Sequence, residues 1–152
     1  MLSPKRGVTF QSPMTETRTT QWTAHVDGAA RGNPGPAGIG VIIADGEGVV
    51  VKEVAEPFGR TTNNVAEYSA LIRALEEALI LGCPAIHIYT DSELMAHQIN
   101  GKYAVKAPHL LPLYQRARIL LGKFNHATVS HVRREFNRRA DALSNIGADQ
   151  VK

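Results

Sequence analysis

The chain has 152 residues, 43% of them hydrophobic, and a formal net charge of +3. This length suits a single domain with one sizeable core and makes a second domain improbable on size alone. The lone Cys83 excludes an internal disulfide, and no apolar run reaches the roughly 18 residues of a membrane-spanning helix. We therefore expect a cytoplasmic protein without a membrane segment. The mild positive charge is compatible with a polyanionic partner and equally with none.

Residues 1–20 are rich in Ser, Thr and Pro and have no hydrophobic period. This composition predicts a disordered N-terminal tail. We expect a single folded domain over residues 21–148.

The first expected element is a strand that ends in an acidic residue. Trp22, Ala24 and Val26 alternate with polar residues, which is typical of a strand with one apolar face, and Asp27 stands at its end. Gly and Pro are dense over residues 28–38, and their density predicts a turn-rich connection.

Two more strands are expected over residues 39–44 and 49–54, separated by the Asp-Gly-Glu-Gly turn at 45–48. With the first strand they would form an antiparallel meander. Pro57 and Gly59 predict a loop after the third strand.

A helix is predicted over residues 65–81, because apolar side chains recur there at helical spacing. They are Leu71, Ile72, Leu75, Ala78 and Leu79. Plain core packing accounts for this stripe.

The middle of the chain predicts a strand over residues 86–90 that ends at Asp91, followed at once by a helix that begins at Ser92 and ends at Asn100. Pro112 is well placed at the start of a further helix over 113–121. Strand, acid and helix thus follow one another directly.

A last strand is predicted over residues 127–132, and the basic segment 131–137 leads from it to a short final helix. We expect Asn137 to cap this helix, with Ala140, Leu143 and Ile146 facing inward and Asp141 pointing elsewhere. Three antiparallel strands followed by alternating helices and strands predict an α/β fold with a mixed sheet flanked by helices.

Four carboxylates stand at strand ends or helix starts of separate elements: Asp27, Glu67, Asp91 and Asp141. Mg²⁺ prefers hard oxygen ligands, and a few carboxylates can hold two ions for phosphodiester hydrolysis without a protein nucleophile. The motifs of nucleophile elbows, Walker loops and zinc proteases do not occur. Taken singly each acid is more often a solvated surface charge, but four in ordered motifs favour a metal-dependent nuclease.

Four segments carry a resemblance to a known family: HVDGAARGNPGPAGIG, RTTNNVAEYSAL, YTDSELM and HVRREFNRRADALSN. Over residues 22–147 they resemble ribonuclease H, type I, in the order of all motifs. The resemblance implies a ribonuclease H-like fold with a five-stranded mixed sheet whose first three strands are antiparallel. It also implies an endonuclease that cleaves the RNA strand of RNA–DNA hybrids, leaving 5′-phosphate and 3′-hydroxyl ends.

Carried over motif by motif, the resemblance makes Asp27, Glu67, Asp91 and Asp141 ligands of two Mg²⁺ ions, for which Mn²⁺ could substitute. Asp27 would bridge both ions. His131 would assist proton transfer and product release, as a neutral imidazole can near physiological pH. The alternative for His131 is an exposed loop histidine.

The resemblance also implies contacts with the hybrid, most of them made by short polar groups that can sense a 2′-hydroxyl. The implied contacts are Ala30, Arg31, Asn33, Thr62, Asn63, Asn64, Ser92 and Asn137. The alternative is local: an ordinary turn in Gly-Asn-Pro-Gly and a helix cap in Thr-Thr-Asn-Asn.

The segment 101–111 is brief, so the chain resembles shorter archaeal and plant-like members that lack the basic handle of bacterial enzymes. In place of the handle, basic side chains elsewhere could contact the phosphates of the hybrid. The alternative is that these side chains form a solvated charged surface. They are Arg116, Arg118, Lys123, Arg133, Arg134, Arg138 and Arg139. We expect a monomer.

Three other functions stay open. A DNA nuclease of the integrase or resolvase type has similar acids, although the paired asparagines favour hybrid recognition. A non-catalytic hybrid-binding module would have little reason to keep four acids. Activity on RNA–RNA duplexes is a third possibility.

Overall fold

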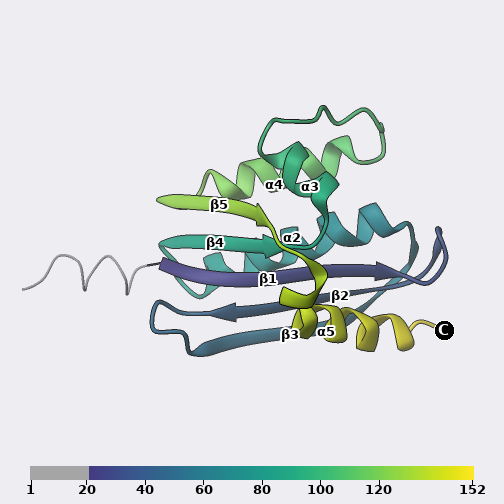
Figure 1. Cartoon of the computed structure of the whole chain (residues 1–152), viewed down its shortest axis with the longest axis horizontal. Coiled ribbons are helices and arrows are strands. Elements are labelled where there is room, and N and C mark those ends of the chain that lie inside the picture. The colour runs from purple at the N-terminus through teal and green to yellow at the C-terminus, as the bar shows by residue number, and fades with distance from the viewer. Residues whose placement is uncertain (1–20) are drawn as a thin grey trace, which may run out of the picture.

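The computed structural model describes residues 21–152, which are built around one five-stranded sheet with the order β3-β2-β1-β4-β5 (Figure 1). The strands are β1 (Gln21–Ala30), β2 (Gly35–Ala44), β3 (Val50–Thr61), β4 (Ala85–Thr90) and β5 (His126–His131). The first three pair antiparallel, whereas β4 is parallel to β1 and β5 is parallel to β4. The predicted five-stranded mixed sheet with an antiparallel start is confirmed.

Helices cover the two faces of this sheet unequally. They are α2 (Asn63–Ile80), α3 (Glu93–Ile99), α4 (Leu111–Leu121) and α5 (Arg138–Asp149), with the 3₁₀ helix η1 (Arg134–Phe136) before α5. In Figure 1, α2, α3 and α4 lie behind the sheet, and α5 crosses in front of β2 and β3. Among residues 21–152, no helix therefore covers the front of β4 and β5.

The apolar stripe of α2 packs against the back of the sheet. Leu71, Leu75 and Ala78 are fully buried, and the stripe meets the inward side chains Val26 of β1 and Ile88 of β4. Each buried leucine contributes about 1.5–3 kcal/mol relative to an exposed one. This packing fixes α2, and with it Glu67, against β1.

Two glycines of β2 let α5 approach the sheet very closely. A Cβ added at Gly38 would lie 2.1 Å from the carbonyl oxygen of Ser144, and one at Gly40 would lie 2.2 Å from that of Ala140. No side chain fits at either position. The first turn of α5, which carries Asp141, is therefore set by direct backbone contact with β2.

Two of the predicted loops are wrong. The Gly- and Pro-rich residues 28–38 contain the end of β1 and the start of β2, so the connection between the strands is short. Strand β3 continues through Pro57 and Gly59 to Thr61. Proline is tolerated there because β3 is an edge strand that pairs only with β2.

The predicted inward face of the last helix is partly wrong. Ala140 is buried, but Ile146 is 47% exposed and Leu143 is only partly buried. The buried face is instead made by small residues, among them Ser144 and Gly147, because α5 lies too close to the sheet for larger ones.

The predicted disordered tail over residues 1–20 lies outside the described residues, and the domain limits at 21 and 148 stay a prediction. Within residues 21–152, each helix is too short or too polar to cross a membrane.

Candidate active site

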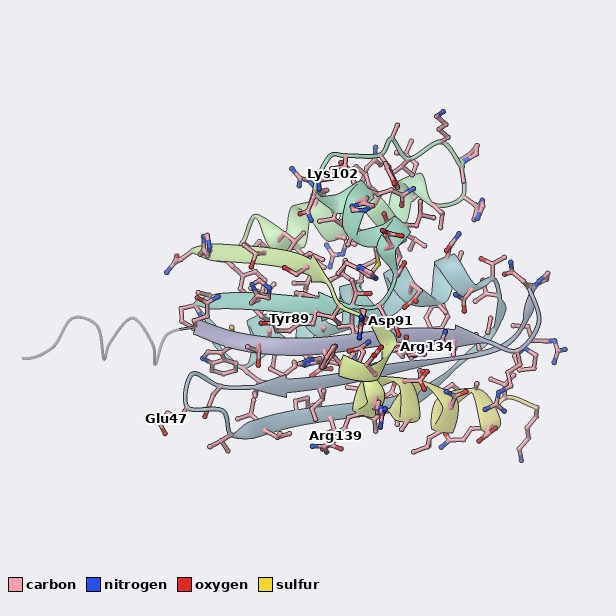
Figure 2. The ribbon with its side chains drawn as sticks, in the orientation of Figure 1. Glu47, Tyr89, Asp91, Lys102, Arg134 and Arg139 are labelled. Atoms are coloured by element: carbon pink, nitrogen blue, oxygen red, sulfur yellow. The ribbon has the colours of Figure 1, made fainter. Side chains whose placement is uncertain are left out.

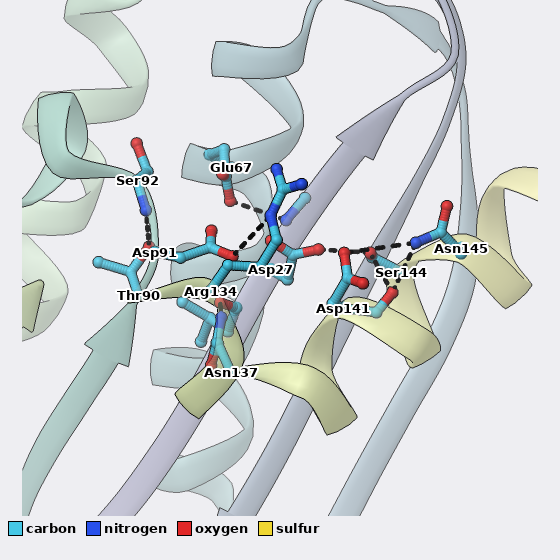
Figure 3. A network of polar contacts seen from close by, with 12 residues as sticks. Asp27, Glu67, Thr90, Asp91, Ser92, Arg134, Asn137, Asp141, Ser144 and Asn145 are labelled. Carbon is cyan, nitrogen blue, oxygen red and sulfur yellow. Dashed lines mark hydrogen bonds and ion pairs between the residues drawn. The ribbon is translucent and has the colours of Figure 1, made fainter. Parts of the chain in front are cut away.

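Three carboxylates from distant parts of the chain meet at one end of the sheet. Asp27 lies on β1, Glu67 on α2, and Asp91 directly after β4. One oxygen from each lies within 4.8 Å of the other two (Figure 3). Asp27 and Glu67 are only 4% and 5% exposed, so their charges have little access to solvent.

Glu67 and Asp27 are each held by one hydrogen bond. The backbone N–H of Gly28 donates to Glu67 Oε1 at 2.8 Å, and the hydroxyl of Ser144 donates to Asp27 Oδ2 at 2.6 Å. A Cβ at Gly28 would lie 2.1 Å from the backbone of Ala66, so only glycine lets β1 and α2 come together here.

Our sequence reasoning missed the roles of Gly28 and Ser144. Ser144 lies three residues after Asp141 on α5, a spacing that puts the two on one helical face, and this could have identified it. The contact of Gly28 with α2 joins segments 39 residues apart, for which the local sequence gives no signal.

Asp91 keeps an oxygen without a hydrogen-bond partner. Its side chain is 10% exposed, and among the described residues its Oδ2 has no donor within hydrogen-bond distance; Arg134 Nε lies 4.0 Å away. Buried carboxylate oxygens are normally satisfied, so an orphaned one in a group of acids fits a site that takes a cation.

Asp141 lies beside this group, in the first turn of α5, but outside the set of mutually close oxygens. Its Oδ1 is 3.4 Å from the Nδ2 of Asn145 one turn later. The charge of Asp141 acts on Asp27 and helps to raise its pKa. The structure thus brings three of the four predicted acids together and places the fourth next to them (Figure 3).

Burial makes these acids hold protons strongly when no cation is bound. It raises the pKa of Asp27 to about 8, with the charges of Asp91 and Asp141 adding to the effect and the hydrogen bond from Ser144 opposing it. Burial also raises the pKa of Glu67 well above its ordinary value, and the charge of Asp27 adds to that. A divalent cation would offset the same repulsion, so the residues present fit a Mg²⁺ site.

His131 is exposed at the end of β5. The parallel register pairs it with Thr90, the residue before Asp91. The imidazole thus stands one strand away from the carboxylates, and its predicted role in proton transfer stays a prediction.

The predicted contacts around Thr-Thr-Asn-Asn include both local and long-range structure. Thr62 caps α2 by accepting from the N–H of Val65, as the local alternative predicted. Asn63 Oδ1 accepts from the N–H of Ala30 at 3.2 Å, and Asn33 Oδ1 accepts from the N–H of Asn63 at 2.9 Å. These bonds tie the β1–β2 turn to the start of α2.

The other predicted contacts with the hybrid include Asn64, Ser92 and Arg31. Asn64 is exposed, and Ser92 caps α3 by accepting from the N–H of Met95 at 3.2 Å. Arg31 contacts Asp149 and Asn145 on α5.

Asn137 stands at the predicted cap position of α5, where its carbonyl accepts from the N–H of Asp141, but its side chain makes no cap hydrogen bond, so the predicted cap is only partly confirmed. Asn137 is 1% exposed, and its Nδ2 donates to the carbonyl of Val26 at 2.9 Å. This bond ties the start of α5 to β1 directly before Asp27.

Comparison with known proteins agrees with this geometry. The family described as "Reverse transcriptase-like" matches residues 25–147. Ribonuclease H of Polaromonas sp. is 36% identical over 151 residues, which cover 89% of this chain and 92% of that protein. The chain belongs to the ribonuclease H family.

Ribonuclease H structures share its fold closely. RNase H1 of the archaeon Halobacterium salinarum superposes with a TM-score of 0.83 at 44% identity, covering 86% of this chain and 99% of that one. LC11-RNase H1, solved in complex with an RNA/DNA hybrid, has a TM-score of 0.79 at 41% identity, covering 85% of this chain and 97% of that one.

Some ribonuclease H relatives are longer than this chain. Ribonuclease HI of Halobacterium salinarum is 45% identical over 128 residues, which are 84% of this chain and 64% of that protein. The matched part is thus just under two thirds of the archaeal protein's length.

Proposed function

We propose that this chain is an endonuclease that hydrolyses the RNA strand of RNA–DNA hybrids with the help of bound divalent ions. The observation that carries the proposal is the meeting of Asp27, Glu67 and Asp91 within 4.8 Å. Membership of the ribonuclease H family and the hybrid bound by LC11-RNase H1 support it.

Asp27, Glu67 and Asp91 would hold the metal, with Asp141 completing the site from α5. Two divalent ions held there would supply activation of an attacking water and stabilisation of the leaving 3′ oxygen, chemistry that would give 5′-phosphate and 3′-hydroxyl ends. Mg²⁺ fits the oxygen-only ligand set, and Mn²⁺ could replace it.

The protein's own groups supply orientation and proton control. Ser144 donates to Asp27 and the N–H of Gly28 donates to Glu67, so both carboxylates present a fixed oxygen to the site. His131, exposed beside the site, would carry a proton during turnover.

Recognition of the hybrid would fall to the segment next to the acids. The linked Asn33 and Asn63 hold the β1–β2 turn against α2, and Asn64 is exposed beside them. Amide groups there could sense 2′-hydroxyls on the RNA strand. We further propose that the protein acts as a monomer.

A panel of labelled duplexes tests the proposal: RNA–DNA, RNA–RNA, DNA–DNA and single-stranded RNA, each with Mg²⁺ or EDTA, for the wild type and Asp27→Asn. We expect Mg²⁺-dependent cutting of the RNA in the hybrid alone, lost in Asp27→Asn. Cutting of DNA would favour the integrase-like alternative, and hybrid binding without cleavage would favour the non-catalytic module.

A further inference from the structure

A cavity of about 390 Å³ lies on the front of the sheet, under the start of α5. Its walls include His25 of β1, Ile42 of β2 and Val50 of β3, with Phe136 of η1 and Arg138 of α5 on the opposite side. His25 and Asp27 are two residues apart on one strand, so their side chains share a face and their Cα atoms are separated by about 7 Å. The cavity is therefore next to the carboxylates.

A row of rings continues from this cavity across the sheet. The parallel register pairs His25 with Tyr89, and their rings stack with centroids 4.8 Å apart. The ring of His87 follows, 4.5 Å from Tyr89. The hydroxyls of Thr128 and Ser130 on β5 are hydrogen-bonded to the two ring nitrogens of His87.

These three rings are only partly buried, although they lie in the middle strands of the sheet. The reason is that α5 packs on β1, β2 and β3, and no other helix of residues 21–152 covers the front of β4 and β5 (Figure 1). Figure 2 shows Tyr89 on this open front, with Asp91 and Arg134 beyond the end of the strand. An aromatic row on an open sheet face is unlike a core cluster, which a helix would cover.

The rim of the cavity is aromatic and cationic. The side chain of Phe136 is 65% exposed, and the guanidinium of Arg133 lies 5.9 Å from its ring centre. Arg133 also pairs with Glu135 at 2.8 Å. Arg138 is exposed and forms no ion pair with any residue from 21 to 152, so its charge is available to an anion.

Partly exposed rings beside the guanidinium of Arg138, which is unpaired within residues 21–152, suit one class of ligand, the unpaired nucleotide. Its base stacks on aromatic side chains and its phosphate contacts arginine, and proteins that bind single strands combine these two features. We propose that the cavity and the row His25–Tyr89–His87 bind an unpaired extension of a hybrid strand as it leaves the carboxylate site. The inference rests on the proposed function and extends its substrate to hybrids with single-stranded ends.

The test compares two hybrids of equal duplex length, one blunt and one with an unpaired extension of about six nucleotides. They compete in one reaction with Mg²⁺, and the ratio of their kcat/KM values is measured, with the extension placed in turn on each strand end. We expect the wild type to prefer one extended hybrid by about fivefold or more, since stacking of even one base is worth this much.

Phe136→Ala should reduce that preference while leaving cleavage of the blunt hybrid unchanged, and Arg138→Ala should reduce the preference as well. Phe58→Ala is the matched control, because Phe58 is also an exposed phenylalanine, 40% exposed, but lies on β3 outside this cavity. It should keep the full preference. Equal cleavage of all hybrids by the wild type, or a preference that both cavity variants retain, would overturn the inference.

Failure of the proposed function would look different, because neither hybrid would then be cut. In that event the fluorescence anisotropy of a labelled single-stranded oligonucleotide decides the matter. Binding that Phe136→Ala weakens and Phe58→Ala does not supports the site, and equal binding by both variants removes it.

Discussion

Replacement of Asp27 by asparagine should abolish activity and at the same time stabilise the metal-free protein. In the folded state burial raises the pKa of Asp27 from an ordinary 3.8 to about 8. Below pH 3.8 both the folded and the unfolded chain hold the proton, so the carboxyl group does not change the free energy of unfolding. Between pH 3.8 and about 8 the unfolded chain releases the proton while the folded chain keeps it, so the free energy of unfolding falls as the pH rises.

The size of this effect follows from the two pKa values. Each unit of difference corresponds to about 1.4 kcal/mol, so at pH 7 the buried carboxyl would cost the fold up to about 4 kcal/mol. Asparagine carries no charge and can accept the hydrogen bond from Ser144, but its amide cannot reproduce every contact of a carboxyl group. We therefore expect a gain of about 2–3 kcal/mol, or roughly 5–10 °C in melting temperature.

The assay is thermal unfolding in EDTA between pH 4 and pH 8, followed by a Mg²⁺ titration at the upper end. The difference between variant and wild type should grow with pH, and Mg²⁺ should stabilise the wild type much more than the variant. Glu47→Gln is the control, because Glu47 lies in the exposed β2–β3 turn (labelled in Figure 2). It should change neither the pH dependence of the melting temperature nor the stabilisation by Mg²⁺. An Asp27→Asn protein that melts below the wild type at pH 8 in EDTA would contradict a destabilising, raised pKa of Asp27.

Three further predictions concern other parts of the molecule. Gly40→Ala should lower stability by about 1–3 kcal/mol in denaturant unfolding, because its Cβ would lie 2.2 Å from the carbonyl of Ala140. Gly122→Ala, whose Cβ would meet only ordinary contacts at 3.5 Å or more and whose φ is −69°, should cost less, and equal losses would contradict the close packing of α5. His131→Ala should lower turnover and leave hybrid binding intact, and unchanged single-turnover and steady-state rates would remove the imidazole from the mechanism. Burial raises the pKa of the Cys83 thiol to about 11, so a thiol reagent at neutral pH should label the native protein far more slowly than the unfolded one; fast native labelling would contradict its burial.

The sequence predicted the order and type of the elements well because their signals are local. Alternation marks β1, helical spacing marks α2, and the strand 86–90 ends at Asp91 as expected. The errors at residues 28–38 and at Pro57 arose because Gly and Pro were taken as loop formers. Their acceptance in β2 and β3 depends on the edge position of β3 and on the close approach of α5, which only the tertiary structure reveals.

The acids of the site could be named from their motifs, but the hydrogen bonds that hold them in place could not. The hydrogen bond from Ser144 to Asp27 joins residues 117 positions apart, and that from Asn137 to the carbonyl of Val26 joins residues 111 apart. No local pattern encodes such contacts. Asn137 looked like a helix cap because the sequence before α5 has the composition of one, whereas the fold uses its side chain to tie α5 to β1.

Single-turnover cleavage of a labelled RNA–DNA hybrid by Asp91→Asn is the sharpest test of the metal site, because Asp91 contributes the carboxylate oxygen that has no donor among the described residues. Glu93→Gln, two residues away and 66% exposed in its side chain, is the matched control. We expect Asp91→Asn to lose nearly all Mg²⁺-dependent cutting of the RNA strand and Glu93→Gln to cut at the wild-type rate. Cutting by Asp91→Asn at a rate close to the wild type would contradict the assignment of this cluster as the metal-dependent catalytic site.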